Sequence, residues 1–321
     1  RPGWQELIIF ARVSPRFWQS APRNGKTKRE CYDMSEQKKT IAQCLRDGEF
    51  VLAPGIFDLI SARMADSKGF KAIYMTGYGI AASYLGQPDA GYATYTDMVG
   101  RASQVTSRTT TPLIADADTG FGGPLNVQHT IRGYEKAGVQ AIQIEDQEFP
   151  KKCGHTLGRR VVPIEDMVTK IEVAAEARES DDFLIIARTD SRTTLGLDEA
   201  LRRGEAFAKA GADIVFIESP ESLDEMKTIC ANFDKPCFAN MVEGGRTPLL
   251  SAAELEDIGF KMAIFPGTGF LATAQVLSNV YGALKKDGIS TDVSDQLYPF
   301  EDMNKLMGFE DVWEFDKKYG D

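Results

Sequence analysis

Asp116 and Asp118 stand in the stretch DADTGFGG, directly after the apolar run PLIA. Two carboxylates two residues apart leave a strand on the same side, because side chains alternate along a strand. Glu145 directly follows the next apolar run along the chain, VQAIQI. Three carboxylates at neighbouring strand ends form an oxygen-rich site that suits Mg²⁺ or Mn²⁺. The alternative, a turn that caps a helix, explains the aspartates but leaves Glu145 unexplained.

A thiol and an imidazole, Cys153 and His155, lie in the stretch KKCGHTLGRR (151–160) among four cationic residues. Nearby cations favour the thiolate, so the pKa of Cys153 could be lowered. A thiol can also act as a general acid that gives its proton to a carbanion. The alternative is a solvated basic loop that carries an incidental cysteine. The residues of this stretch leave these options open.

Other polar residues follow further apolar runs. The segment TGYG (76–79) offers consecutive backbone N–H groups, which suit a carboxylate or phosphate but also occur in a simple turn. Arg188 ends the apolar run FLIIAR, where a charge needs a partner. It either forms an ion pair with Glu218 or Asp190 or holds a substrate carboxylate. Glu218 and Asn240 allow the same two interpretations.

The elements that must position these residues appear as eight short apolar runs without strict alternation, which is typical of strands buried on both faces. Helical patterns separate most of them. The runs cover residues 51–54, 71–75, 112–115, 139–144, 183–187, 213–217, 236–239 and 261–265.

Eight strands that alternate with helices predict an α/β fold, a (β/α)₈ TIM barrel. Four runs are entered through similar phrases with a glycine at the helix end: SKGFKAI, KAGVQAI, KAGADIV and DIGFKMAI. A doubly wound open sheet is the alternative, and the lack of GxGxxG after the first run disfavours it. Polar residues gather after the runs, where a barrel places its active site.

Composition limits the class of partner. The 321 residues carry a net charge of −10, and no apolar run reaches the roughly 18 residues of a membrane span. We therefore expect no nucleic-acid and no membrane partner. The five cysteines are odd in number and contain no CxxC motif, which favours free thiols in a reducing compartment. Cytoplasmic localisation is the expectation.

The N-terminal region differs from the rest of the chain. Residues 1–33 hold seven Lys or Arg residues and three acidic residues, and MSEQKKT then looks like a natural start. We predict an N-terminal extension over 1–34, disordered or non-native, and a single barrel domain with a C-terminal helical segment over 35–321. The alternative is a transit peptide, which would make the protein mitochondrial.

The ordered motifs TGYGIAASYLGQPD, DADTGFGG, IEDQ, KKCGH, ARTD and NMVEGG resemble the isocitrate lyase/phosphoenolpyruvate mutase superfamily over about residues 35–290. This resemblance implies a (β/α)₈ barrel, a C-terminal helix that is swapped between subunits, and a homodimer or homotetramer. Lyases of this superfamily carry cysteine in KKCGH, whereas its phosphonate enzymes carry asparagine. The chain is therefore similar to the carbon–carbon lyases, with Cys153 as the acid that protonates the leaving carbanion.

The resemblance also implies the other site residues. Asp116, Asp118 and Glu145 match the Mg²⁺ ligands, and Mn²⁺ is the alternative ion. The remaining matched residues surround the substrate: Thr76, Gly77, Tyr78 and Arg188 at its C1 carboxylate, Asp89 on a loop near the metal, Tyr74 near the reacting hydroxyl as base or relay, His155, Glu218 and Asn240 at the far end of the pocket, and Gly154 on the mobile loop.

The implied substrate is a small 2-hydroxy dicarboxylate of the 2,3-dialkylmalate type. The phrase NMVEGGRTPLL is similar to the 2,3-dimethylmalate lyases and petal death protein, and also to the oxaloacetate acetylhydrolases, which are the alternative. A 2-methylisocitrate lyase is disfavoured, because Leu271 and Phe300 stand where those enzymes have arginines for a third carboxylate. A barrel that binds a ligand without turning it over is the non-enzymatic alternative.

Overall fold

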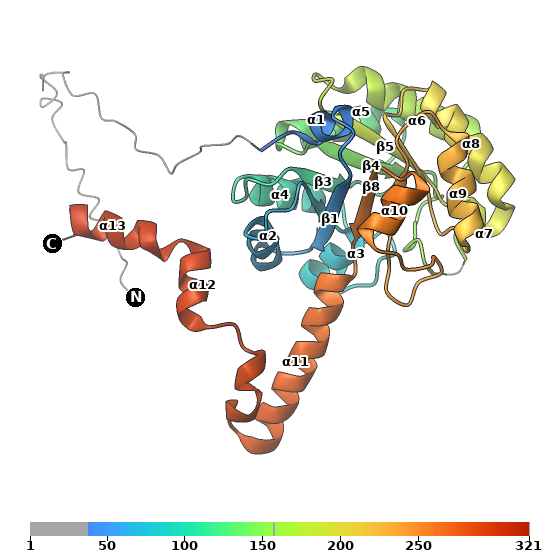
Figure 1. Ribbon diagram of the computed structural model, residues 1–321. Helices are drawn as coiled ribbons and strands as arrows, with labels where there is room; N and C mark the ends of the chain where they lie inside the picture. The colour runs from blue at the N-terminus through green and yellow to red at the C-terminus, as the bar shows by residue number, and fades with distance from the viewer. Residues whose placement is uncertain (1–37, 157, 321) are drawn as a thin grey trace, which may run out of the picture. The chain divides into compact units, whose positions relative to one another are not determined.

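A closed barrel of eight parallel strands forms the centre of the computed structural model, which describes residues 38–156 and 158–320 (Figure 1). Strand β1 pairs with both β2 and β8, and a bridge between Val215 and Cys237 links the β6 and β7 ends of the sheet. The predicted (β/α)₈ barrel is confirmed, and the open doubly wound sheet is excluded. The strands are β1 (Val51–Ile56), β2 (Ile73–Met75), β3 (Leu113–Asp116), β4 (Ala141–Glu145), β5 (Leu184–Thr189), β6 (Ile214–Ile217), β7 (Phe238–Asn240) and β8 (Met262–Phe265).

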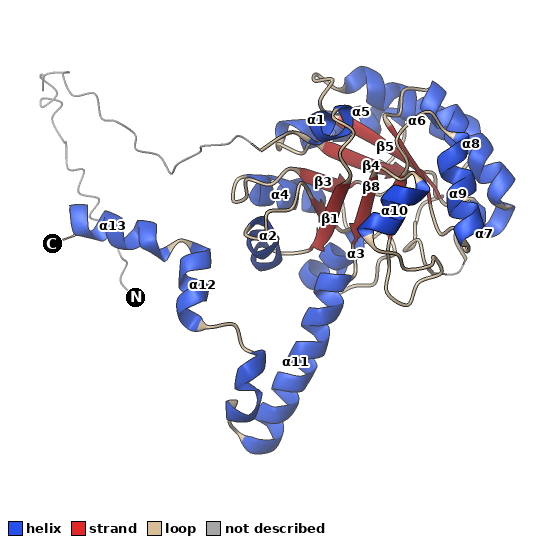
Figure 2. Cartoon of the chain, in the orientation of Figure 1, coloured by secondary structure: helices blue, strands red, loops and turns tan. Residues whose placement is uncertain are grey.

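Helices surround the strands (Figure 2). Side-chain caps define several helix starts, as Asp58 does for α2 and Thr94 for α4. Glycines with positive φ end others, as at Gly69 and Gly138, where the φ angles are 74° and 84°. The helices are α1 (Ile41–Arg46), α2 (Leu59–Asp66), α3 (Gly77–Ile80), η1 (Ala81–Leu85), α4 (Tyr95–Thr106), α5 (Pro124–Lys136), α6 (Ile164–Ala177), α7 (Arg192–Leu195), α8 (Leu197–Lys209), α9 (Leu223–Asn232), α10 (Ala252–Ile258), α11 (Thr268–Asp287), η2 (Thr291–Gln296), α12 (Phe300–Met307) and α13 (Phe309–Tyr319).

The core has two layers because residues alternate between the two faces of each strand. In β5, Leu184 and Ile186 belong to the cluster inside the barrel, whereas Ile185 and Ala187 pack against the helices outside it. Helix α1 adds Ile41 to the inner cluster next to the start of β1. The barrel interior is thus filled and closed near the strand starts, which leaves the carboxyl ends of the strands for a site.

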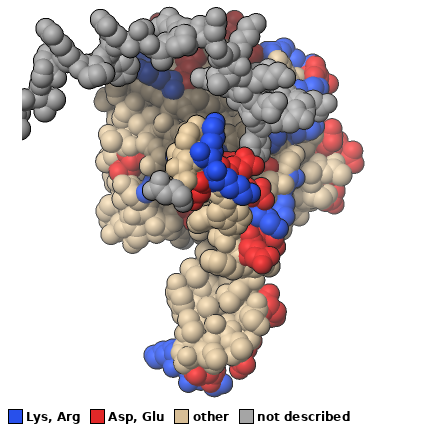
Figure 3. Space-filling model, turned by 90° about the vertical axis from the view of Figure 1, so that its left-hand side faces the viewer, with Lys and Arg blue, Asp and Glu red and all other residues tan. Residues whose placement is uncertain are grey.

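A C-terminal arm, defined as residues 268–319, follows β8. Helix α11 contacts β1 through its beginning and then exposes apolar side chains, among them Leu277 and Tyr281. Apolar side chains of α13, such as Trp313 and Phe315, are exposed as well. Figure 3 shows that the lowest part of the molecule, which this arm forms, is largely uncharged above its tip.

Several expectations concern the ends and the partners of the chain. The predicted extension over 1–34 lies outside the described residues. Among the described cysteines, Cys44, Cys153, Cys230 and Cys237 are free thiols. Within the described ranges, no helix combines the length and the hydrophobicity that crossing a membrane requires.

Candidate active site

Strand alternation brings the predicted polar residues into the barrel mouth. Leu184 and Ile186 face the interior, so Arg188, two residues further along β5, faces the same way. Asp116, Glu218 and Asn240 each follow a residue of the inner cluster by two positions, so they face the interior as well. Glu145 follows the inner residue Ala141 by four positions on the same face, and Tyr74 itself belongs to the inner cluster.

A cavity of about 240 Å³ opens at these strand ends. Most of the predicted site residues line it: Tyr74, Thr76, Tyr78, Asp89, Asp116, Cys153, Gly154, His155, Arg188 and Asn240. The other four, Gly77, Asp118, Glu145 and Glu218, are buried directly behind this lining. The structure therefore brings all fourteen predicted residues together, while their roles remain predictions.

The first side of the cavity is acidic. Asp116 accepts hydrogen bonds from the backbone N–H groups of Gly77 (3.2 Å) and Asp118 (2.9 Å). The ammonium of Lys151 lies 2.5 Å from an oxygen of Asp89 and 2.8 Å from an oxygen of Asp118. Two carboxylates therefore contact one buried ammonium. The Gly77 N–H that was expected to hold a substrate carboxylate already donates to Asp116.

This acidic side fits a hydrated divalent cation. Burial raises the pKa of Asp118 to about 7 and that of Glu145 well above its usual range, so both anions need positive charge nearby. Within residues 38–156 and 158–320, no three His, Cys, Asp or Glu side chains converge on a single point. An oxygen of Glu145 instead lies 3.1 Å from Arg188. Since Mg²⁺ keeps several water ligands, these carboxylates suit an ion held partly through water.

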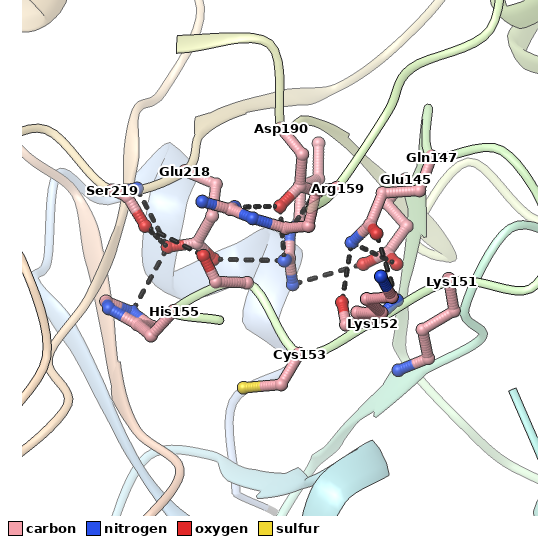
Figure 4. A network of polar contacts seen from close by, with 12 residues as sticks. Glu145, Gln147, Lys151, Lys152, Cys153, His155, Arg159, Asp190, Glu218 and Ser219 are labelled. Carbon is pink, nitrogen blue, oxygen red and sulfur yellow. Dashed lines mark hydrogen bonds and ion pairs between the residues drawn. The ribbon is translucent and has the colours of Figure 1, made fainter. Parts of the chain in front are cut away.

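The second side of the cavity is organised around Arg188. Figure 4 shows the three residues whose carboxylates contact it, Glu145, Asp190 and Glu218. Its guanidinium lies 2.9 Å from Asp190, 3.1 Å from Glu145 and 3.3 Å from Glu218. Burial alone would lower the pKa of Arg188, but the charges of Asp190 and Glu145 raise it well above its usual value. Arg188 therefore stays protonated. It forms structural ion pairs and also lines the cavity, so the two roles considered for it, ion pairing and binding of a substrate carboxylate, do not exclude each other.

Glu218 joins the far end of the pocket to Arg188. It lies 3.2 Å from Nε2 of His155 and accepts a hydrogen bond of 3.0 Å from the Asn240 amide. Burial tends to raise the pKa of Glu218, yet Arg188 and His155 hold it well below the usual range. The backbone N–H of Arg246 donates to Nδ1 of His155, so a neutral ring carries its proton on Nε2.

Cys153 is half-buried on the loop of residues 151–160, and burial raises the pKa of its thiol to about 11. The expectation that neighbouring cations lower this pKa is wrong, because burial raises it by more than Arg188 and Lys151 lower it. The backbone N–H of Cys153 donates to the Asp89 carbonyl at 3.1 Å. A thiol that is protonated at neutral pH is suited to act as an acid.

Tyr74 and Gly154 show how closely the site is packed. The Tyr74 hydroxyl donates to Gln143 at 3.0 Å, and burial raises its pKa well above the usual value. The phenol is therefore a donor or a relay more readily than a base. A Cβ on Gly154 would lie 2.8 Å from the Glu218 carboxyl carbon, so only glycine lets the loop approach this closely.

Sequence reasoning missed two buried cations of the loop, Lys151 and Arg159, because it treated the four cations alike. No sequence signal separates each of them from its exposed neighbour. Leu271 lines the cavity. At this position an apolar side chain therefore faces the substrate, where the 2-methylisocitrate lyases are expected to have an arginine. Phe300 lies on α12, is 79% exposed and does not line the cavity in this chain.

Several known proteins are similar to this chain in sequence and in architecture. The family model described as phosphoenolpyruvate phosphomutase matches residues 41–285. A 2,3-dimethylmalate lyase of Eubacterium barkeri is 50% identical over 86% of this chain and 96% of its own. Oxaloacetate acetylhydrolase, solved with 3,3-difluorooxalacetate, is 34% identical with a TM-score of 0.80, and the match covers 85% of this chain and 93% of that one. Phosphonopyruvate hydrolase, solved with oxalate and Mg²⁺, is 29% identical with a TM-score of 0.77, covering 86% and 96% of the two chains. Because the family model spans most of the barrel and half of the aligned residues equal those of a curated relative, this chain belongs to the phosphoenolpyruvate phosphomutase family.

Proposed function

We propose that the protein is a carbon–carbon lyase that cleaves a 2,3-dialkylmalate, such as 2,3-dimethylmalate, into a 2-oxo acid and a short carboxylic acid. The observation that carries this proposal is that the Cys153 thiol lines one cavity together with Arg188 and with apolar side chains. Val242, Phe270 and Leu271 are among these side chains and form what we call the apolar wall. The similarity to 2,3-dimethylmalate lyase supports this choice of substrate.

The residues of the site divide the reaction between them. Arg188 binds and orients the carboxylate next to the reacting carbon. The C2 hydroxyl gives its proton to a carboxylate of the acidic side as the C2–C3 bond breaks, and the bonding electrons pass to the C3 fragment. Cys153 gives its proton to C3, which yields propionate and pyruvate from 2,3-dimethylmalate. The proton held by the carboxylate returns to the Cys153 thiolate through solvent when the products leave. The loop that carries Cys153 keeps water from the site.

The cofactor of the proposed reaction is Mg²⁺, with Mn²⁺ as a substitute, held by Asp116, Asp118 and Glu145. A bound divalent ion supplies positive charge that lowers the pKa of the substrate hydroxyl. The raised pKa values of Asp118 and Glu145 support a cation at this position. The Mg²⁺ reported for phosphonopyruvate hydrolase supports the choice of ion.

A substrate panel with Mg²⁺ tests the proposal: 2,3-dimethylmalate, 2-methylmalate, oxaloacetate and 2-methylisocitrate, with products identified by NMR. We expect pyruvate and propionate from 2,3-dimethylmalate. The similarity to oxaloacetate acetylhydrolase makes that activity the second candidate. Oxalate and acetate as the main products, without alkylmalate cleavage, would assign the protein to that activity. No turnover together with no affinity for Mg²⁺ or Mn²⁺ would favour a binding protein.

The C-terminal arm supports a further part of the proposal, a helix-swapped homodimer that assembles into a tetramer. Apolar residues spaced along α11 and α13, including Tyr281 and Trp313, are exposed in the single chain. Surfaces of this kind are usually covered by a partner. Light scattering coupled to size exclusion tests this, and a monomer at micromolar concentration would contradict it.

A further inference from the structure

Two adjacent arginines of the loop differ in their environment. The side chain of Arg159 is 1% exposed, whereas that of Arg160 is 79% exposed and pairs with Glu148 at the surface. A buried guanidinium is stable only where partners satisfy its charge and its donors. The contacts of Arg159 therefore indicate what the residue is for.

Arg159 joins three segments of the chain. Its Nη1 donates to Asp190 Oδ1 at 2.6 Å, and its Nη2 donates to the Thr193 hydroxyl at 2.6 Å. Its Nε donates to the carbonyl of Thr156 at 3.2 Å. One rigid guanidinium thus links the loop to the end of β5 and to α7.

Asp190 also contacts Arg188, so the position of Asp190 affects the orientation of the Arg188 side chain. The two carboxylate oxygens of Asp190 accept from Nε and Nη2 of Arg188, each at 2.9 Å. The backbone N–H of Asp190 donates to Asp146 at 2.9 Å, which fixes the position of the residue. Figure 4 shows Asp190 next to Arg159. The orientation of Arg188 is therefore held by a carboxylate that Arg159 also holds.

The other contact of Arg159 reaches the turn that carries Cys153. The backbone N–H and the hydroxyl of Thr156 donate to the carbonyl of Cys153 at 3.0 and 2.8 Å. The Thr156 carbonyl in turn accepts from Arg159. Two short chains of hydrogen bonds therefore run from one guanidinium, one to Cys153 and the other to Arg188.

We propose that Arg159 is a positioning residue that fixes the Cys153 acid relative to the Arg188 carboxylate clamp. It lines no part of the cavity and acts only through Asp190 and Thr156. The inference rests on the proposed function, in which these two groups contact opposite parts of one substrate. Misplacement of such groups by about 1 Å can lower a rate about 100-fold.

Arg159→Met and Arg160→Met form a matched pair, because both remove one positive charge from the same loop. Four quantities are measured in full-length protein: kcat for 2,3-dimethylmalate, Mn²⁺ affinity, oxalate affinity in the presence of Mn²⁺, and the rate at which iodoacetamide labels Cys153, followed by peptide mass spectrometry. We expect Arg159→Met to bind oxalate about tenfold more weakly, to label faster at Cys153 and to lose about 100-fold in kcat. Mn²⁺ affinity stays unchanged, since the acidic side is intact, and Arg160→Met resembles the wild type throughout.

Arg159→Lys separates positioning from charge. A lysine keeps the charge but cannot hold Asp190, Thr193 and Thr156 at once, so we expect its kcat to lie between those of wild type and Arg159→Met. Equal oxalate affinity and equal Cys153 labelling in the two methionine variants would overturn the proposal.

If Arg159→Met does not fold, Arg159→Lys replaces it, since lysine keeps the charge but cannot contact Asp190 and Thr156 in the same way. A lower kcat and faster Cys153 labelling with unchanged Mn²⁺ affinity are then expected, and wild-type values of kcat and labelling overturn the proposal. Failure of the proposed function has a different signature, because wild-type protein would then neither bind oxalate with Mn²⁺ nor cleave 2,3-dimethylmalate.

Discussion

The two sides of the cavity differ in their charge balance. On the acidic side, Asp89 and Asp118 contact the ammonium of Lys151, and the charge of Asp116 also acts on it. On the other side, the guanidinium groups of Arg188 and Arg159 face the carboxylates of Asp190 and Glu218, with Glu145 between the sides. The acidic side therefore lacks positive charge and suits a further cation, whereas the donors of the basic side are already occupied by protein carboxylates.

This difference indicates that substrate binding at Arg188 depends on a cation on the acidic side. A substrate carboxylate that approaches Arg188 must compete with Asp190, Glu145 and Glu218 for the same donors. A cation on the acidic side adds the attraction that the basic side alone does not provide. Each side can be altered separately by substitution, and Cys153 on the loop belongs to neither.

The largest expected effect comes from Cys153→Ser, which leaves the charges of both sides unchanged. A hydroxyl is a weaker acid than a thiol, so we expect kcat for 2,3-dimethylmalate to fall about 10²- to 10⁴-fold, the usual contribution of a general acid. Mn²⁺ and oxalate affinities should equal those of wild type in titration calorimetry. A variant with wild-type kcat would assign the proton transfer to another group.

Asp118→Asn weakens the acidic side alone. We expect Mn²⁺ affinity, measured by electron paramagnetic resonance, to fall about 10- to 100-fold, as for other groups that act near a metal through water. Asp182→Asn, which removes an exposed carboxylate paired with Arg46, is the matched control and should bind Mn²⁺ as wild type does. Equal affinity in both variants would contradict a cation site at Asp118.

The pH dependence of kcat should report the buried thiol. Only the protonated form of Cys153 can donate, and its pKa is raised to about 11. The rate is therefore maintained through the ordinary range of thiol ionisation near pH 9 and falls about tenfold per pH unit above pH 11. Stopped-flow assays between pH 8 and 11.5 measure this, with circular dichroism as a control for unfolding. A decline centred near pH 8.5 would indicate a thiol with its ordinary pKa and would contradict the effect of burial.

The smallest effect is expected for Lys152→Met. Lys152 is exposed, and its ammonium contacts only a backbone carbonyl, that of Gly158, within the described residues. Surface contacts of this kind contribute little, so kcat and Mn²⁺ affinity should stay within about twofold of wild type. Lys151→Met, one residue earlier, should change both quantities more than that, because it removes a buried ammonium from Asp89 and Asp118. Equally small changes in the two variants would contradict the distinction between the buried and the exposed cation.

The sequence predicts the barrel and much of the site because alternation along a strand determines where side chains point. Asp116, Glu145 and Arg188 follow apolar runs in the inward series, and the structure extends β3, β4 and β5 to include them. Gln143, which accepts from Tyr74, belongs to the same series and could have been found in this way.

Other features depend on contacts that no local pattern contains. Lys151 and Lys152 are adjacent and chemically identical, and only the positions of Asp89 and Asp118 decide which one is buried. The pKa of Cys153 was predicted in the wrong direction for the same reason, since burial outweighs cations that other groups hold.

The position of α11 has a consequence for how the protein must be handled. Its first turn supplies Phe270 and Leu271 to the apolar wall of the cavity, and the rest of the helix exposes apolar side chains. If a second chain covers those side chains, subunit dissociation disturbs the same helix that shapes the substrate pocket. Specific activity would then fall on dilution, and kinetic constants compared between laboratories would need a stated protein concentration.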